Sequence, residues 1–221
     1  MTLEEPCLFA SEDWCTIPFF LHAKSPFDKF VDILVQLPGC LPLRIDMERL
    51  KEEEVVASEN SRRGLVMQAE KLLSLLDQFW EQHRWQVDPD YDKRWYSNYL
   101  MEECGLRDVA SPYGGGAIFT NTFTATFTAL YDAANIIVLR NLTAASSPTT
   151  GIHSRRITAH AASVLASIAY HEAAGPFSGG SFSMVFPLKV VCFLSTSERQ
   201  RSAAQEALLS WGANRGMTDI T

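Results

Sequence analysis

The sequence predicts an all-α protein, a single domain of about seven helices over residues 1–221 that is preceded by an irregular N-terminal arm. Two observations favour this fold class. Apolar residues recur every three or four positions in several long segments, which is the period of an amphipathic helix. Residues that start or stop helices bound those segments, and no pair of segments has the pattern of partner strands.

The arm, residues 1–24, is expected to be irregular but packed against the helices, because its large apolar side chains are poorly suited to water. These side chains are Trp14, Ile17, Phe19, Phe20 and Leu21. Ser25 then caps a helix that begins at Pro26 and ends at Pro38-Gly39.

Two further helices are expected, a charged one over 43–58 and an amphipathic one over 62–85. The second has the clearest apolar stripe of the chain: Leu65, Ala69, Leu72, Leu73, Leu76, Phe79 and Trp80. A loop over 107–117 follows an aromatic and acidic segment. Its glycine run lacks the Lys-Ser/Thr of a phosphate-binding loop, so it is a weak nucleotide site.

The stretch 117–140 is the longest without glycine, proline or a dense charge cluster, and its pattern is ambiguous. Threonine alternates with phenylalanine and small residues, which is typical of a strand. The same residues place Phe119, Phe123 and Phe127 four apart, as on a helix face. The apolar stripe then continues to Leu139, far beyond the usual length of a strand, so we expect a helix.

The remaining third is expected to be helical after a polar loop over 143–151. One helix covers 152–173 and an apolar one covers 182–194. Thr196-Ser197-Glu198 caps a last helix that Gly216 ends.

Composition limits the function classes. A net charge of −7 disfavours a surface for binding phosphates, so we expect no direct binding of nucleic acid. The five cysteines are scattered and none forms a Cys-x-x-Cys pair, which predicts a reducing compartment and no zinc module. The N-terminal residues lack the order of a signal peptide and no apolar run has the length of a membrane span, so we expect a nuclear or cytoplasmic protein.

Three histidines are the first candidate site residues. His153, His160 and His171 are 7 and 11 residues apart, so they share one helix face. Neighbours on that face are about 10 and 16 Å apart, too far to bind one metal ion. Either they lie between helices or at their rim, or one of them, best His171, lines a pocket as a proton donor or acceptor.

The central stretch adds Asp132 and Tyr131 as candidate catalytic residues beside His171. A carboxylate near an apolar stripe is either a perturbed acid or a residue that faces solvent or an arginine. We also expect an apolar cavity between the central helix, the 152–173 helix and the aromatic loop, although a filled core is an equal alternative. Its expected ligand-binding residues are Phe123, Phe127, Tyr131, Trp95, Tyr99 and His171. We expect no metal and no cofactor.

Three segments together resemble a known family. SEDWCTIPFF with SPFDKFVDILVQLPGCL, then FTATFTALYDAANIIVLRNL, then ASVLASIAYHEAAGPFSGGSFSMVFPLKVVCFL with SERQRSAAQEALLSWGANRGM follow in one order. They resemble the regulatory region of fungal zinc binuclear-cluster transcription factors. The six-cysteine zinc cluster of that family does not match this chain. The resemblance therefore implies a helical effector-type domain without the family's DNA-binding module, either a trimmed piece or a natural short protein.

Two classes of function follow from this resemblance and from the residues. The first is a regulatory domain that binds an apolar small molecule or a protein partner, with a homodimer as a further option. The second is a cofactor-independent enzyme, a cyclase, pericyclase or isomerase of secondary metabolism. Such chemistry needs a shaped, dry pocket and one or two hydrogen-bond donors, so the absence of catalytic motifs does not exclude it.

Overall fold

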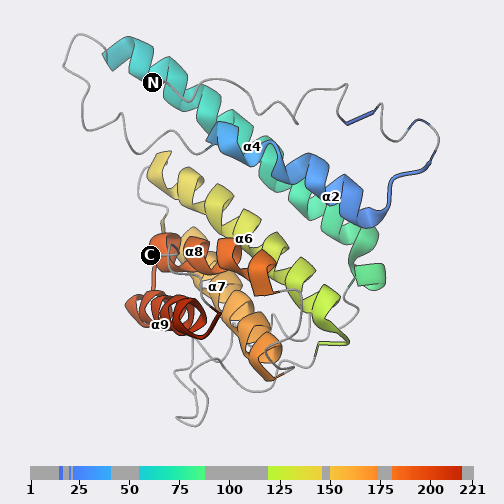
Figure 1. Ribbon diagram of the computed structural model, residues 1–221. Helices are drawn as coiled ribbons and strands as arrows, with labels where there is room; N and C mark the ends of the chain where they lie inside the picture. Colours follow the sequence, from blue (N-terminus) through green and yellow to red (C-terminus); the bar gives the residue numbers. More distant parts are fainter. Residues whose placement is uncertain are drawn as a thin grey trace. The chain divides into compact units, whose positions relative to one another are not determined.

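The computed structural model describes residues 15–16, 20, 22–40, 55–87, 119–145, 150–173 and 181–215. Within these ranges the chain forms six α-helices and one 3₁₀ helix, without a strand, which confirms the all-α prediction (Figure 1). The α-helix count is one below the expected seven. Residues 55–58 were expected in a separate charged helix, but they begin the same helix that contains 62–85.

The chain divides into two compact units. One contains Met1–His83 and Ile137–Thr150, and the other contains Arg84–Ile136 and Gly151–Thr221. Each unit is therefore discontinuous in sequence, and α6 (Thr122–Ala145) contributes residues to both. The single domain expected from the sequence stays a prediction.

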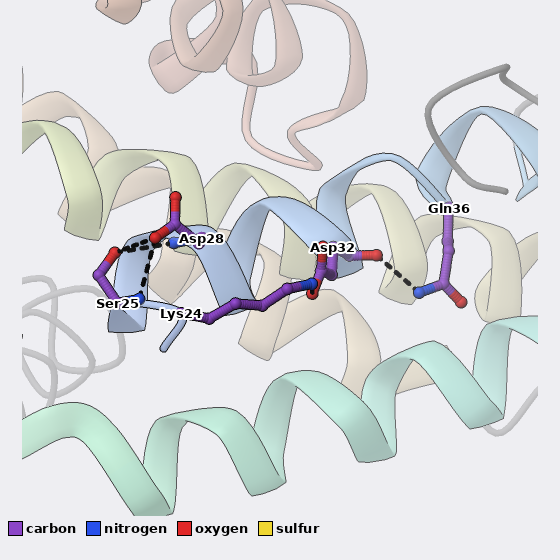
Figure 2. Close-up of polar contacts among 5 residues, drawn as sticks. All are labelled: Lys24, Ser25, Asp28, Asp32 and Gln36. Carbon is purple, nitrogen blue, oxygen red and sulfur yellow. Dashed lines mark hydrogen bonds and ion pairs between the residues drawn. The ribbon is translucent and has the colours of Figure 1, made fainter. Parts of the chain in front are cut away.

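The first unit contains α2 (Pro26–Leu34), whose start is fixed by a reciprocal cap. The Asp28 N–H donates to Ser25 Oγ at 3.2 Å, and the Ser25 N–H donates to Asp28 Oδ2 at 2.9 Å (Figure 2). This capping box satisfies backbone donors that have no partner within the first turn. The predicted serine cap and first-turn proline are confirmed, and the 3₁₀ helix η3 (Leu37–Cys40) follows.

The helix α4 (Val55–Val87) provides the apolar stripe on which the first unit packs. Its residues Leu72, Leu76 and Phe79 are buried, as the stripe predicts. The ring of Phe79 lies 5.3 Å from that of Phe30 on α2, which runs alongside α4 (Figure 1). The expected break before residue 62 does not occur, because the segment contains no proline to stop the helix.

The arm is described only in part. The Cys15 side chain hydrogen-bonds the Asp32 carboxylate, which also forms an ion pair with Lys24, so one point of the arm is attached to α2. Phe20, however, is 88% exposed, so the expectation that it packs against the helices is wrong. A single phenylalanine at the surface is tolerated, since apolar atoms make up much of any protein surface. Trp14, Ile17, Phe19 and Leu21 lie outside the described residues.

The second unit contains the first part of α6, together with α7 (Thr150–Ala173), α8 (Ser181–Leu194) and α9 (Glu198–Arg215). The central stretch is a helix, as predicted, but it starts later than expected. Asn121 is its cap and accepts the Thr124 N–H at 2.9 Å on Oδ1. The helices α6 and α7 also extend into the predicted loop over 143–151, whereas the loop over 107–117 lies outside the described residues.

The corner between α8 and α9 is bonded to α7. Gln200 Nε2 donates to the Thr158 carbonyl at 2.9 Å, and Gln200 Oε1 accepts from Ser195 Oγ at 2.7 Å. The Thr158 and Thr196 hydroxyls lie 2.9 Å apart. Because these polar groups satisfy one another, the corner is held to α7 where two helices meet.

The helix α6 is buried along most of its length, and every residue from Tyr131 to Leu139 is buried. Within the described residues, Thr122–Ala144 is the one helical stretch whose length and composition would suffice to cross a membrane. Within the apolar 18-residue window of this stretch, 78% is buried inside the protein, and the core helix of a soluble protein passes the same test. The stretch is therefore weak support for a membrane span.

Candidate functional site

The centre of the candidate site is a hydrogen-bonded pair between α6 and α7. Asp132 Oδ1 lies 2.8 Å from His160 Nδ1. The side chain of Asp132 is 0% exposed and that of His160 is 5% exposed. Each residue sits in the middle of its helix, where the surrounding side chains are apolar or small. Two titratable groups are therefore held together away from solvent.

A second polar contact joins the same two helices. His171 Nε2 lies 3.0 Å from Thr126 Oγ1. The two contacts pair the earlier residue of α6, Thr126, with the later residue of α7, His171, and the later residue Asp132 with the earlier residue His160. The two helices therefore run antiparallel. His160 and His171 both contact α6, which agrees with the prediction that they lie on one face of their helix.

Other buried polar residues extend this arrangement into what we call the polar layer of α6 and α7. Its members are Thr124, Thr128, Asp132, Asn135, His160, Ser163, Ser167 and His171. Some of them bond to their own helix: Asn135 Nδ2 donates to the Tyr131 carbonyl at 3.0 Å, and Ser167 Oγ donates to the Ser163 carbonyl at 3.1 Å. Such bonds let short polar side chains be buried inside a helix pair.

Aromatic rings border the two histidines. The Tyr131 ring meets the His160 ring edge-on at 6.5 Å, and the Tyr170 ring meets the His171 ring edge-on at 6.4 Å. The Phe119 ring packs in turn against Tyr170 at 5.5 Å. These edge-to-face contacts are a favoured geometry for ring pairs and restrict the orientation of each imidazole.

The structure brings together some of the predicted catalytic residues and separates others. Tyr131 and Asp132 form one cluster with His160, whereas His171 contacts Thr126 in a second cluster on the same two helices. The alternative in which Asp132 faces solvent is wrong, because its carboxylate is buried against an imidazole.

His160 is the residue that sequence reasoning undervalued. It was recognised as one of three histidines on a shared face, but His171 was preferred as the functional one. One sequence signal did point to His160, namely its position before Ala161–Ile168, a segment of small and apolar residues. A histidine inside a buried helix needs a polar partner, and the buried aspartate on α6 provides it.

The predicted ligand-binding residues differ in their surroundings. Phe127 and Tyr131 are buried, as an inward position requires. Phe123 is 57% exposed and its ring lies 6.0 Å from that of Phe127, so its role in ligand binding stays a prediction. It lies in the first turn of α6, where the helix begins later than expected. Trp95 and Tyr99 lie outside the described residues, and the apolar cavity stays a prediction.

The chemistry of the pair follows from the atoms that meet. When the Asp132 carboxylate is ionised it can only accept a hydrogen bond, and His160 Nδ1 is then the donor. The contact at Nδ1 fixes the orientation of the ring and leaves Nε2 outside this hydrogen bond. Among the described residues, no group of three or more His, Cys, Asp or Glu side chains is arranged to hold a metal ion.

Comparison with protein-family models, with curated proteins and with solved structures finds no match for this chain. Its function is therefore inferred from its own residues and from the resemblance of its sequence motifs.

Proposed function

We propose that this chain is a helical regulatory or effector-type domain, similar to the regulatory region of fungal zinc binuclear-cluster transcription factors. In this proposal it binds an apolar small molecule or a protein partner. The observation that carries the proposal is the Asp132–His160 pair, in which two titratable groups contact each other rather than an open surface.

The energetics of such a pair favour two discrete arrangements of α6 and α7. Burying one member without the other is costly, because a charge or polar group then loses water without gaining a partner. Two arrangements are therefore stable: one in which Asp132 and His160 are hydrogen-bonded, and one in which both side chains contact water or ligand. Arrangements in which the two side chains are apart but still buried are disfavoured. A ligand or partner that prefers one arrangement would shift the balance between them, which is how a regulatory domain responds.

A cofactor-independent enzyme is the second candidate, and one observation favours it. Asp132 orients His160 through Nδ1, as a carboxylate orients a general base, and Tyr131 lies beside the ring as a further hydroxyl. Against it, both members of the pair are buried, so a substrate would first have to separate α6 from α7. We therefore rank the regulatory function first.

The two candidates are distinguished by one experiment on the purified chain. The protein is incubated with a panel of apolar polyketide- and terpene-type metabolites. Binding is followed by the intrinsic tryptophan fluorescence of the chain, to which Trp211, whose indole N–H bonds Glu172 of α7, contributes. Conversion is followed by mass and retention time. Saturable binding without conversion is the result we expect.

Three variants decide the interpretation. Turnover that is lost in His160→Asn, His171→Asn or Tyr131→Phe, and kept in the half-buried control His153→Ala, would replace the regulatory proposal with the enzyme. Absence of both binding and conversion across the panel would remove the small-molecule part and leave a protein partner.

A further inference from the structure

The helix α8 has an exposed side that is aromatic instead of polar. Phe186 is 44% exposed and Phe193 is 69% exposed. They are seven residues apart, close to two helical turns, so both rings lie on one side of the helix. Lys189 lies between them on that side and is half-buried. We call these three residues the α8 face.

The opposite side of α8 accounts for its packing. Met184, Leu188 and Val191 are buried, and α8 packs against α9. The fold of this unit therefore does not need the two exposed rings. Single exposed apolar residues are common, but two large rings on one helix side with no neutral polar residue between them are typical of a binding surface.

Lys189 gives the α8 face a chemical preference. It forms no ion pair with any residue in the part of the chain that the structure describes. A partner that covers the two rings would also cover this ammonium group, and covering it without a counter-charge is costly. The partner must therefore place a carboxylate opposite Lys189 and apolar side chains opposite the rings.

We propose that the α8 face docks an amphipathic helix of a protein partner, in which two apolar side chains flank an aspartate or glutamate. This inference rests on the proposed regulatory function and specifies the surface and chemistry of its protein partner. An amphipathic helix fits because its apolar positions recur with the spacing of Phe186 and Phe193, and the acidic position falls between them.

Two other occupants fit less well. A second copy of this chain that used the same face in a two-fold dimer would bring the two Lys189 side chains together, because each lies near the midpoint of its own face. An anionic membrane would meet one lysine on a protein whose net charge is −7, whereas interfacial helices are rich in lysine and arginine. The acidic amphipathic helix is the occupant that matches both the rings and the charge.

The test uses the full chain and a fluorescein-labelled helical peptide with leucines seven residues apart and a glutamate midway. Anisotropy should show saturable binding, weakened about tenfold or more by Phe193→Ser and by Lys189→Glu, as expected for the centre of an interface. Phe123→Ser, which changes an exposed phenylalanine on α6, is the matched control and should bind normally. A peptide with lysine in place of glutamate should bind the Lys189→Glu variant better than the original chain.

Several outcomes would overturn the proposal. These are no saturable binding of the glutamate peptide, equal weakening by Phe123→Ser, or no recovery on exchanging the charges. Binding to phosphatidylserine vesicles that Phe193→Ser abolishes would assign the face to a membrane, and a concentration-dependent dimer lost in that variant would assign it to a second copy. Metabolite binding that survives Phe193→Ser while the peptide fails would reject this docking face and leave the regulatory function intact.

Discussion

Asp132 and His160 are bonded at 2.8 Å from the middle of α6 to the middle of α7, and the carboxylate has no exposed surface. The pair joins residues 28 positions apart and provides a polar contact within a helix pair that is otherwise rich in alanine, isoleucine and valine. Apolar packing tolerates small shifts of one helix along another, whereas a buried hydrogen bond of defined length does not. Together with the Thr126–His171 contact, the pair therefore stabilises one alignment of α6 and α7.

Replacing His160 with alanine should destabilise the protein strongly. The change leaves the Asp132 carboxylate buried without its imidazole, and breaking a buried pair by removing one partner costs about 3–5 kcal/mol. The measurement is the free energy of unfolding from urea denaturation, followed by circular dichroism. His153→Ala, on the same helix but half-buried, is the control and should cost far less. Equal losses in the two variants would mean that the pair does not stabilise the helices.

Replacing Thr126 with valine should weaken the second contact between α6 and α7 while keeping the side-chain shape. It removes the hydroxyl that lies 3.0 Å from His171 Nε2, and the expected loss is about 1 kcal/mol. The ring nitrogen chemical shift of His171, measured by NMR, should also change. Thr122→Val in the first turn of α6 is the matched control. An unchanged His171 signal would show that the hydroxyl does not bond the ring in solution.

The cap of α2 should respond to acid. The Ser25 hydroxyl and the Ser25 backbone N–H donate to Asp28 and lower the pKa of its carboxyl below 3.8. A carboxyl whose pKa is lower in the folded state stabilises that state above its unfolded pKa, and this contribution is lost as pH falls toward the folded value. An NMR titration of Asp28 should give a midpoint below 3.8, and Ser25→Ala should raise it. A midpoint that Ser25→Ala leaves unchanged would contradict the cap as the cause.

Cys15 should react slowly with alkylating reagents. Burial raises the pKa of its thiol above 9.0, and the neighbouring Asp32 carboxylate raises it further. Since the thiolate is the nucleophile, a raised pKa lowers the reactive fraction at any pH below it. Asp32→Asn should accelerate modification of Cys15 by iodoacetamide at pH 8, measured residue by residue with mass spectrometry. Glu70→Gln on α4, which also removes one surface carboxylate, is the control and should leave the rate unchanged. A rate that Asp32→Asn does not raise would contradict the role of the carboxylate.

The sequence by itself determined the all-α class, the cap of α2 and the start of α9. The signals for a helix start lie within one turn of each other, so Ser25 and the Thr196-Ser197-Glu198 segment could be recognised without knowledge of the fold. The length of the apolar run also decided correctly that the central stretch is a helix. Its first residue was placed too early, because the cap at Asn121 was not recognised.

The tertiary structure alone decided which polar residues meet. Asp132 lies in a helix that is buried on almost every side, so the apolar pattern does not show which neighbour its carboxylate faces. Helical periodicity placed His160 and His171 on one face of α7. It could not show which of them has the functional contact, since separations of 7 and 11 residues both keep a side chain on that face. The choice depends on where α6 lies along α7, which is set by packing between residues far apart in sequence. That alignment puts Asp132 opposite His160 and Thr126 opposite His171.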